Sequence, residues 1–157
     1  MFTNSDMIMN TLTGSAKGMA EERQAISMFE RIQRTASRSS LLAFLTGRSN
    51  RLQSLDQAAS QHSATDRHYL GIRSVPIGQI RGSETRTADF DRRFRPLNSR
   101  TMYRWTSILT ASLNGIPLPA VDLIKVGDSY FVRDGHHRIS VAAFLGQEFI
   151  EADVTEW

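Results

Sequence analysis

The sequence predicts an α+β fold, in which a small mixed sheet with packed helices is preceded by an α-helical arm at the N-terminus. Apolar residues recur at helical spacing through much of the first part, whereas short alternating stretches separated by Gly and Pro turns follow from Tyr69 onward. The length of 157 residues, 40% of them hydrophobic, suits one globular domain with an appendage. We therefore expect a helical arm over residues 1–65 and an α+β domain over residues 66–157.

The arm is predicted mainly from one amphipathic stretch. Residues 1–18 show no sustained period, so we expect no stable element there. Residues 19–38 keep their apolar side chains on one helical face. The apolar stretch 41–45 ends just before Gly47, and glycine is common immediately after a helix.

A short helix and a linker are expected to complete the arm. Asn50 is a typical N-cap residue for a short helix that carries Leu52, Leu55 and Ala58. Residues 60–66 are small or polar and predict a linker.

The polar face of the arm invites two interpretations. It carries four arginines that would suit nucleic acid or a membrane surface, namely Arg23, Arg31, Arg34 and Arg38. The interpretation we favour is that the apolar face packs on the α+β domain or on a second copy, giving a homo-oligomer through the N-terminal helices. Packing alone explains the apolar stripe, so no further partner is required.

The α+β domain is predicted to contain a strand, a helix, two strands, a helix and a strand, in that order. The strands are expected near residues 70–77, 121–126, 130–132 and 149–154, and the helices near residues 105–113 and 136–145. Residues 78–80 predict a turn, and residues 82–97 predict an Arg-rich loop with Phe90 and Phe94 as anchors.

The composition excludes several classes of function. With no Cys, the chain cannot be a disulfide-stapled module, hold a Cys-ligated metal or use a cysteine nucleophile. It lacks the roughly 18 consecutive apolar residues of a membrane span, and its start lacks the pattern of a signal peptide. We therefore expect a cytoplasmic protein without membrane contact. The net charge of +3 is too small to indicate DNA binding by itself.

The most informative feature is a strand that leads through Gly135 directly into a helix. The backbone N–H groups of the first helical residues, His136, His137 and Arg138, would then be unpaired beside the positive end of the helix dipole. Gly135 would let a phosphate approach the backbone closely. The two histidines would donate to phosphate oxygens from an exposed turn, and the Arg138 guanidinium would bind the phosphate in a bidentate manner.

Two alternatives compete with phosphate binding. Asp134 is expected to be the N-cap of this helix, and the cap together with surface histidines needs no ligand. A metal site is less favoured, because adjacent histidines point apart and no third ligand has a suitable spacing. We predict no metal site.

The string from Asp134 to Arg138, read Asp-Gly-His-His-Arg, resembles the phosphate-binding motif of the ParB/sulfiredoxin superfamily. The resemblance extends upstream through residues 119–131 and 75–80, so it spans about residues 69–157 and leaves out the helical arm. It implies a small α+β fold that binds nucleotide phosphates at Asp134, Gly135, His136, His137 and Arg138.

Branches of the superfamily differ in activity. Sulfiredoxins use a cysteine in this motif, where His136 stands here, so their activity is excluded. Chromosome-partitioning members carry a helix-turn-helix domain after this module, and none follows here, so that role is not expected. The free-serine kinase branch is most similar around the motif, although residues 86–95 depart from its pattern, so serine cannot be assumed as the substrate.

The kinase branch places a catalytic Glu shortly after its first strand, and Glu84 is the matching residue. The resemblance therefore implies a nucleotide (ATP, ADP or CTP) with Mg²⁺, and a kinase or nucleotide hydrolase acting by phosphoryl transfer to a small hydroxyl substrate. Glu84 would be the general base. Its alternative role is a solvated loop carboxylate paired with Arg86.

A nucleic-acid-associated ParB-like module is the rival function. In it the same turn would grip backbone phosphate, with or without nuclease activity, and the Arg-rich arm would add affinity. A nuclease is the weaker form of this hypothesis, because the sequence shows no acidic metal cluster of the usual kind.

Overall fold

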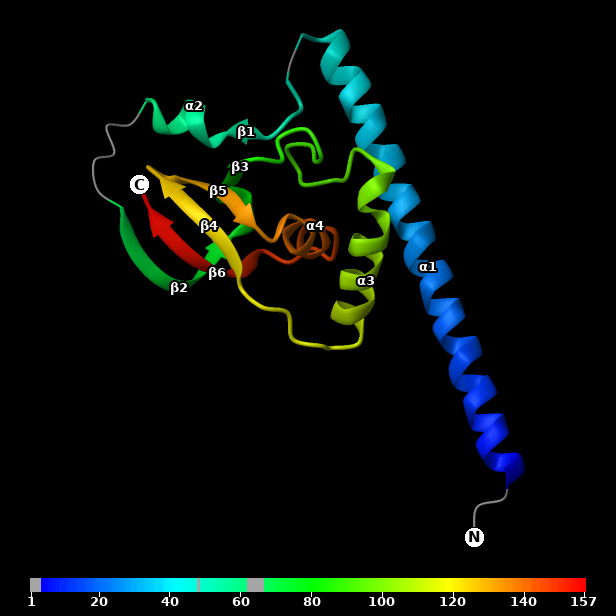
Figure 1. The fold of residues 1–157 in the computed structure, drawn as a ribbon. Coiled ribbons are helices and arrows are strands. Elements are labelled where there is room, and N and C mark those ends of the chain that lie inside the picture. The colour runs from blue at the N-terminus through cyan, green and yellow to red at the C-terminus, as the bar shows by residue number, and fades with distance from the viewer. Residues whose placement is uncertain (1–3, 48, 62–66) are drawn as a thin grey trace.

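A six-stranded mixed sheet forms the centre of the protein (Figure 1). The computed structural model describes residues 4–47, 49–61 and 67–157. The helices are α1 (Asn4–Leu45), α2 (Leu55–Ala59), α3 (Met102–Leu113) and α4 (His136–Phe144), and short 3-10 turns span Ile77–Gln79 and Ser99–Thr101. The strands are β1 (Gln53–Ser54), β2 (His68–Pro76), β3 (Ile80–Ser83), β4 (Val121–Val126), β5 (Ser129–Asp134) and β6 (Phe149–Glu156).

The strand order in the sheet is β1-β3-β5-β4-β6-β2. Neighbours β1 and β3, β3 and β5, and β4 and β6 run parallel, whereas β4 and β5 form an antiparallel hairpin and β2 pairs antiparallel with β6. The predicted α+β class is therefore confirmed. The four strands and two helices expected after the linker are all present in the expected order.

The prediction was wrong about the segment around β3. Ile80–Ser83 is a strand between β1 and β5, where the sequence predicted first a turn and then a loop. β3 can pack this closely between its two neighbours because residue 82 is glycine. A Cβ at that position would collide with the Gln53 carbonyl and the Phe131 ring. The loop that follows is anchored as predicted, with Phe90 and Phe94 almost fully buried.

Each face of the sheet has its own apolar core. On one face, Val121, Leu123 and Val132 pack with Ile139 of α4. On the other, Ile124, Val126 and Phe131 pack with Leu55 at the start of α2. Burying a side chain of this kind contributes about 1.5–3 kcal/mol, so α4 is held on the sheet, and its first turn lies at the end of β5.

Helix α1 packs on α3 at the outer side of the domain (Figure 1). Phe29 meets the Trp105 ring edge-on with 5.6 Å between ring centroids, and Ala25 and Ile32 lie beside Leu109 in the same cluster. The middle of the apolar stripe, from Ala25 to Ala36, is thus buried within this chain. Large apolar residues of α1 outside this stretch are exposed, namely Met19, Leu41, Leu42, Phe44 and Leu45. No helix in the described ranges combines the length and hydropathy needed to cross a membrane.

Two predictions about the arm were wrong. Helix α1 begins at Asn4, not near residue 19, because a helix packed over its middle can extend at little cost through residues that contain no Pro. The short helix begins at Leu55 and has Ser54 at its N-cap, whereas the Asn50 amide donates to Ser40. Most of the predicted linker, residues 62–66, lies outside the described residues.

Candidate functional site

The turn between β5 and α4 is built around Gly135. This glycine is the N-cap of α4 with φ 100° and ψ 17°, in the left-handed region that side chains rarely adopt. An added Cβ would collide with Val121 of the neighbouring strand. The prediction that Asp134 caps the helix was wrong: the cap is Gly135, no side chain caps α4, and the Asp134 carboxylate bonds to Arg138 one turn on.

The first turn of α4 leaves three backbone donors unused. The first hydrogen bond of the helix runs from Ile139 N–H to the Gly135 carbonyl at 3.0 Å. Among the residues that the structure describes, no hydrogen bond is made by the backbone N–H groups of His136, His137 or Arg138. These three donors lie at the positive end of the helix dipole, which is an arrangement that favours an anion.

The two histidines of the motif are buried, so the expectation of an exposed turn was wrong. His136 is 4% exposed and His137 is 8% exposed, because Phe90 of the anchored loop covers both rings. Phe90 stacks on His136 at 5.9 Å and meets His137 edge-on at 5.4 Å. The Nε2 of His137 is buried and has no hydrogen-bond partner in the described part of the chain.

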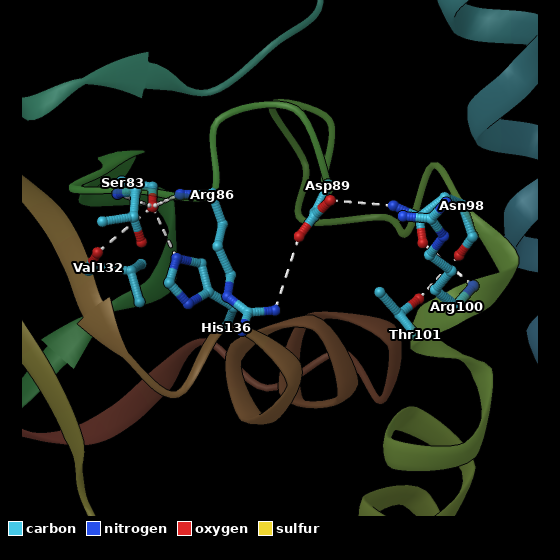
Figure 2. A network of polar contacts seen from close by, with 9 residues as sticks. Ser83, Arg86, Asp89, Asn98, Arg100, Thr101, Val132 and His136 are labelled. Atoms are coloured by element: carbon cyan, nitrogen blue, oxygen red, sulfur yellow. Dashed lines mark hydrogen bonds and ion pairs between the residues drawn. The ribbon is translucent and has the colours of Figure 1, made fainter.

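Ser83, at the end of β3, holds His136 (Figure 2). Its Oγ lies 2.7 Å from His136 Nε2, and the same oxygen accepts the backbone N–H groups of Thr85 and Arg86 at 3.2 and 2.9 Å. Sequence reasoning missed Ser83. The available signal was a serine followed by polar residues, a pattern typical of a turn in which the hydroxyl accepts later backbone N–H groups.

Burial keeps both histidines neutral at ordinary pH. Burial, together with the nearby Arg86 charge, lowers the pKa of His136 to about 4. Burial likewise lowers the pKa of His137 to about 4, with the Arg104 and Arg86 charges acting in the same direction. The positive charge near the turn therefore resides on arginines and on the helix end, not on imidazoles.

A hollow of about 240 Å³ opens at this turn, and we call it the α4 hollow. It is lined by Thr85, Arg86, Arg104, Ile108, Arg133, Asp134, Gly135, His136, His137 and Arg138. Three segments meet there: the loop after β3, helix α3 and the β5–α4 turn. The five residues predicted for the phosphate site all lie in this lining.

The arginines of the hollow differ in how they are engaged. Arg104 has no carboxylate within ion-pair distance among the described residues. Arg86 lies 3.6 Å from Asp89, and both of these side chains are partly exposed. Arg138, by contrast, donates to the carbonyls of Pro119 and Ala120 at 2.7 and 2.8 Å. Arg138 also donates to Asp134 at 2.6 Å, so both terminal nitrogens of its guanidinium already donate hydrogen bonds within the protein.

Glu84 lies beside the hollow and is not part of its lining. Its backbone N–H pairs with the Val132 carbonyl at 3.0 Å, and its carboxylate is 3.5 Å from Arg133. Arg133 also lies 3.8 Å from Asp122 on β4. Glu84 is thus paired with Arg133, whereas Arg86, its expected partner in solvent, pairs with Asp89.

Across the described residues, no group of three or more His, Asp or Glu side chains is arranged to hold a metal ion. A larger hollow of about 440 Å³ lies between α1 and α4 beside Arg93 and Arg95, and none of the motif residues lines it.

No family model matches the chain, and no curated protein matches it. Among solved structures, the chain is similar to sulfiredoxin from Arabidopsis thaliana at 20% sequence identity and a TM-score of 0.40. The likeness covers 53% of this chain and 82% of that protein.

Proposed function

We propose that the protein binds the phosphate group of a nucleotide at the N-terminus of α4. The observation that supports the proposal is that two features occur together in the α4 hollow. Within the described part of the chain, three backbone N–H groups at this turn make no hydrogen bond, and the buried Nε2 of His137 has no partner. Buried polar groups in proteins are normally hydrogen-bonded, so such a cluster of unused groups points to a ligand.

The charged groups that line the hollow indicate that the ligand carries negative charge. The lining holds Arg86, Arg104 and Arg133 in addition to the helix end, and its two histidines are neutral. A phosphate would convert the unused donors into charge-assisted hydrogen bonds, each worth about 1.5–3 kcal/mol. A cation would meet a single carboxylate in this lining, that of Asp134, which is already paired with Arg138.

The size of the hollow limits how much of the ligand it encloses. About 240 Å³ is below the roughly 300–1,000 Å³ of sites that enclose a drug-sized molecule. The hollow therefore suits the phosphate end of ATP, ADP or CTP, with the base and sugar lying outside. Mg²⁺ would arrive on the nucleotide as part of the substrate, because no group of three described side chains is arranged to hold it.

We further propose that this site supports phosphoryl transfer to a small hydroxyl substrate, with Glu84 as the general base. The supporting observation is the 3.5 Å contact of Glu84 with Arg133, which places the carboxylate next to a side chain of the lining. Because that contact is the link between Glu84 and the hollow, binding and transfer must be tested separately.

The binding test is titration calorimetry of inorganic phosphate, ADP, ATP and CTP, each with and without Mg²⁺. Arg104→Gln and Arg86→Gln each remove a charge from the hollow and should weaken binding about tenfold, the effect of losing about 1.4 kcal/mol. Arg100→Gln is the matched control, because Arg100 is exposed and does not line the hollow. No binding by wild type, or equal losses in all three variants, would refute the proposal.

Titration of a DNA or RNA duplex at several salt concentrations tests the nucleic-acid alternative. A module that grips a DNA or RNA backbone should bind a duplex with an affinity that falls by about 0.9 decades per decade of salt for each phosphate contacted. Duplex binding of that kind, without nucleotide binding, would replace the proposed function by the rival one.

A further inference from the structure

The hydrogen bonds around Ser83 fix where its proton lies. Backbone N–H groups can only donate, so the contacts from Thr85 and Arg86 occupy both lone pairs of the Ser83 oxygen. The hydroxyl then has one proton to give, and the 2.7 Å distance to His136 is far shorter than the 3.4 Å distance to the Val132 carbonyl. Ser83 therefore donates to His136.

This direction of donation fixes the tautomer of His136. An Nε2 that accepts the Ser83 proton carries a lone pair, so a neutral imidazole must hold its own proton on Nδ1. An imidazolium is disfavoured by the same count, because a proton on Nε2 would find no free lone pair on Ser83. The other ring nitrogen points away from Ser83 (Figure 2), and no hydrogen bond of the described residues involves it.

We propose that Ser83 is a positioning residue for the phosphate site, holding His136 so that its Nδ1–H, rather than a lone pair, is offered to an unprotonated phosphate oxygen. This inference rests on the proposed function. The Nδ1–H of His136 would be a fourth donor to the phosphate, in addition to the three unpaired backbone N–H groups of His136, His137 and Arg138. It also makes phosphate recognition independent of histidine protonation, because the ring donates while neutral.

Without the Ser83 hydroxyl, either nitrogen of His136 can carry the proton. Whenever Nδ1 is bare, its lone pair would face the phosphate and repel it. Protonation of the whole ring would remove that repulsion, so binding would then improve as the pH falls. The charged and titratable groups that face His136 are Arg86, Asp89, Asp134 and His137, and all of them remain in a Ser83 variant.

The direct test needs no ligand. Nitrogen chemical shifts and long-range proton–nitrogen couplings of the His136 ring, measured by NMR at pH 7.5, distinguish the two tautomers. Wild type should show the proton on Nδ1, and a proton on Nε2 would overturn the inference. Ser83→Ala should shift the population toward Nε2–H. Ser140→Ala is the matched control, because it removes a similarly buried hydroxyl that accepts from Trp105.

The binding test follows inorganic phosphate by calorimetry between pH 5.5 and 8, with sulfate as a probe whose own charge does not change over that range. Sulfate affinity should be level in wild type and should rise toward low pH in Ser83→Ala. Ser83→Thr, which keeps the hydroxyl, should restore the wild-type profile and guards against misfolding of the Ala variant. Parallel profiles in wild type and Ser83→Ala would overturn the positioning role, whereas wild type that binds neither anion would overturn the proposed function.

Discussion

Arg138 binds Asp134 across one turn, with 2.6 Å between Nη2 and Oδ2, and its Nη1 reaches the carbonyls of Pro119 and Ala120. The motif arginine thus ties the start of α4 to the segment that enters β4. The Arg138 side chain is 14% exposed, so water competes little for these hydrogen bonds.

We predict that Arg138→Ala destabilises the protein by about 2–4 kcal/mol, because it leaves two carbonyls and a carboxylate without their donor. Denaturant unfolding followed by circular dichroism would measure this. Arg133→Ala is the matched comparison, with ion pairs at 3.5 and 3.8 Å on a more exposed side chain, and should cost below about 1 kcal/mol. Similar costs for both variants would show that the bonds of Arg138 are not structural.

Gly135 combines a positive φ with a close approach to Val121, and the two effects can be separated. Gly135→Ala should destabilise the protein by more than 2 kcal/mol, through backbone strain plus steric overlap. Gly146→Ala shares a positive φ but meets nothing within 4 Å, so it should cost only about 1 kcal/mol.

A double-mutant cycle tests the steric part. Val121→Ala removes the atoms that a Cβ at Gly135 would strike, so the two substitutions together should cost less than the sum of their separate effects. Strict additivity in urea unfolding would mean that Val121 is not what excludes a side chain at this position.

The sequence predicted the motif turn correctly in outline but not in its cap. Aspartate is a better N-cap than glycine in general, and that preference favoured Asp134. Here the carboxylate bonds to Arg138, and the backbone at the cap adopts a positive φ that residues other than glycine rarely adopt. Local propensity could not reveal this, because it depends on the side chain one turn later and on Val121 of another strand.

Ser83 was missed for a related reason. A strand of four residues with a glycine in it has too short a pattern to be distinguished from a loop, and its pairing with β1 and β5 is non-local. The burial of the histidines was missed because Phe90, which covers them, lies more than 40 positions earlier in the chain. Phe90 was predicted as an anchor, but its partner could not be identified.

The two histidines make stability depend on pH. Their pKa values are lowered to about 4 in the folded protein, below the ordinary value of 6.5, so the unfolded chain takes up protons first as the pH falls. Stability should therefore be level above about pH 7 and decrease between pH 6.5 and 4. The loss is at most about 3 kcal/mol for each histidine.

Urea midpoints at pH 7.5, 6, 5 and 4.5 would measure this dependence. His137→Gln should reduce the slope between pH 6.5 and 4.5, because it removes one of the two groups that titrate differently in the folded and unfolded states. An unchanged slope would assign the pH dependence to other groups.

Glu84→Gln tests the phosphoryl-transfer part of the proposed function. The substitution keeps the size of the side chain and its backbone bond to Val132, but it removes the carboxylate that would accept the proton of a substrate hydroxyl. We expect nucleotide binding within about threefold of wild type by calorimetry and at least a hundredfold loss of turnover, the usual scale of a lost general base. Glu148→Gln, which alters an exposed carboxylate in the turn between α4 and β6, is the control and should behave as wild type. Turnover is followed by phosphorus NMR with ATP, Mg²⁺ and a panel of small hydroxy compounds. Equal turnover in Glu84→Gln and wild type would remove Glu84 from the mechanism and leave the α4 hollow as a phosphate-binding site alone.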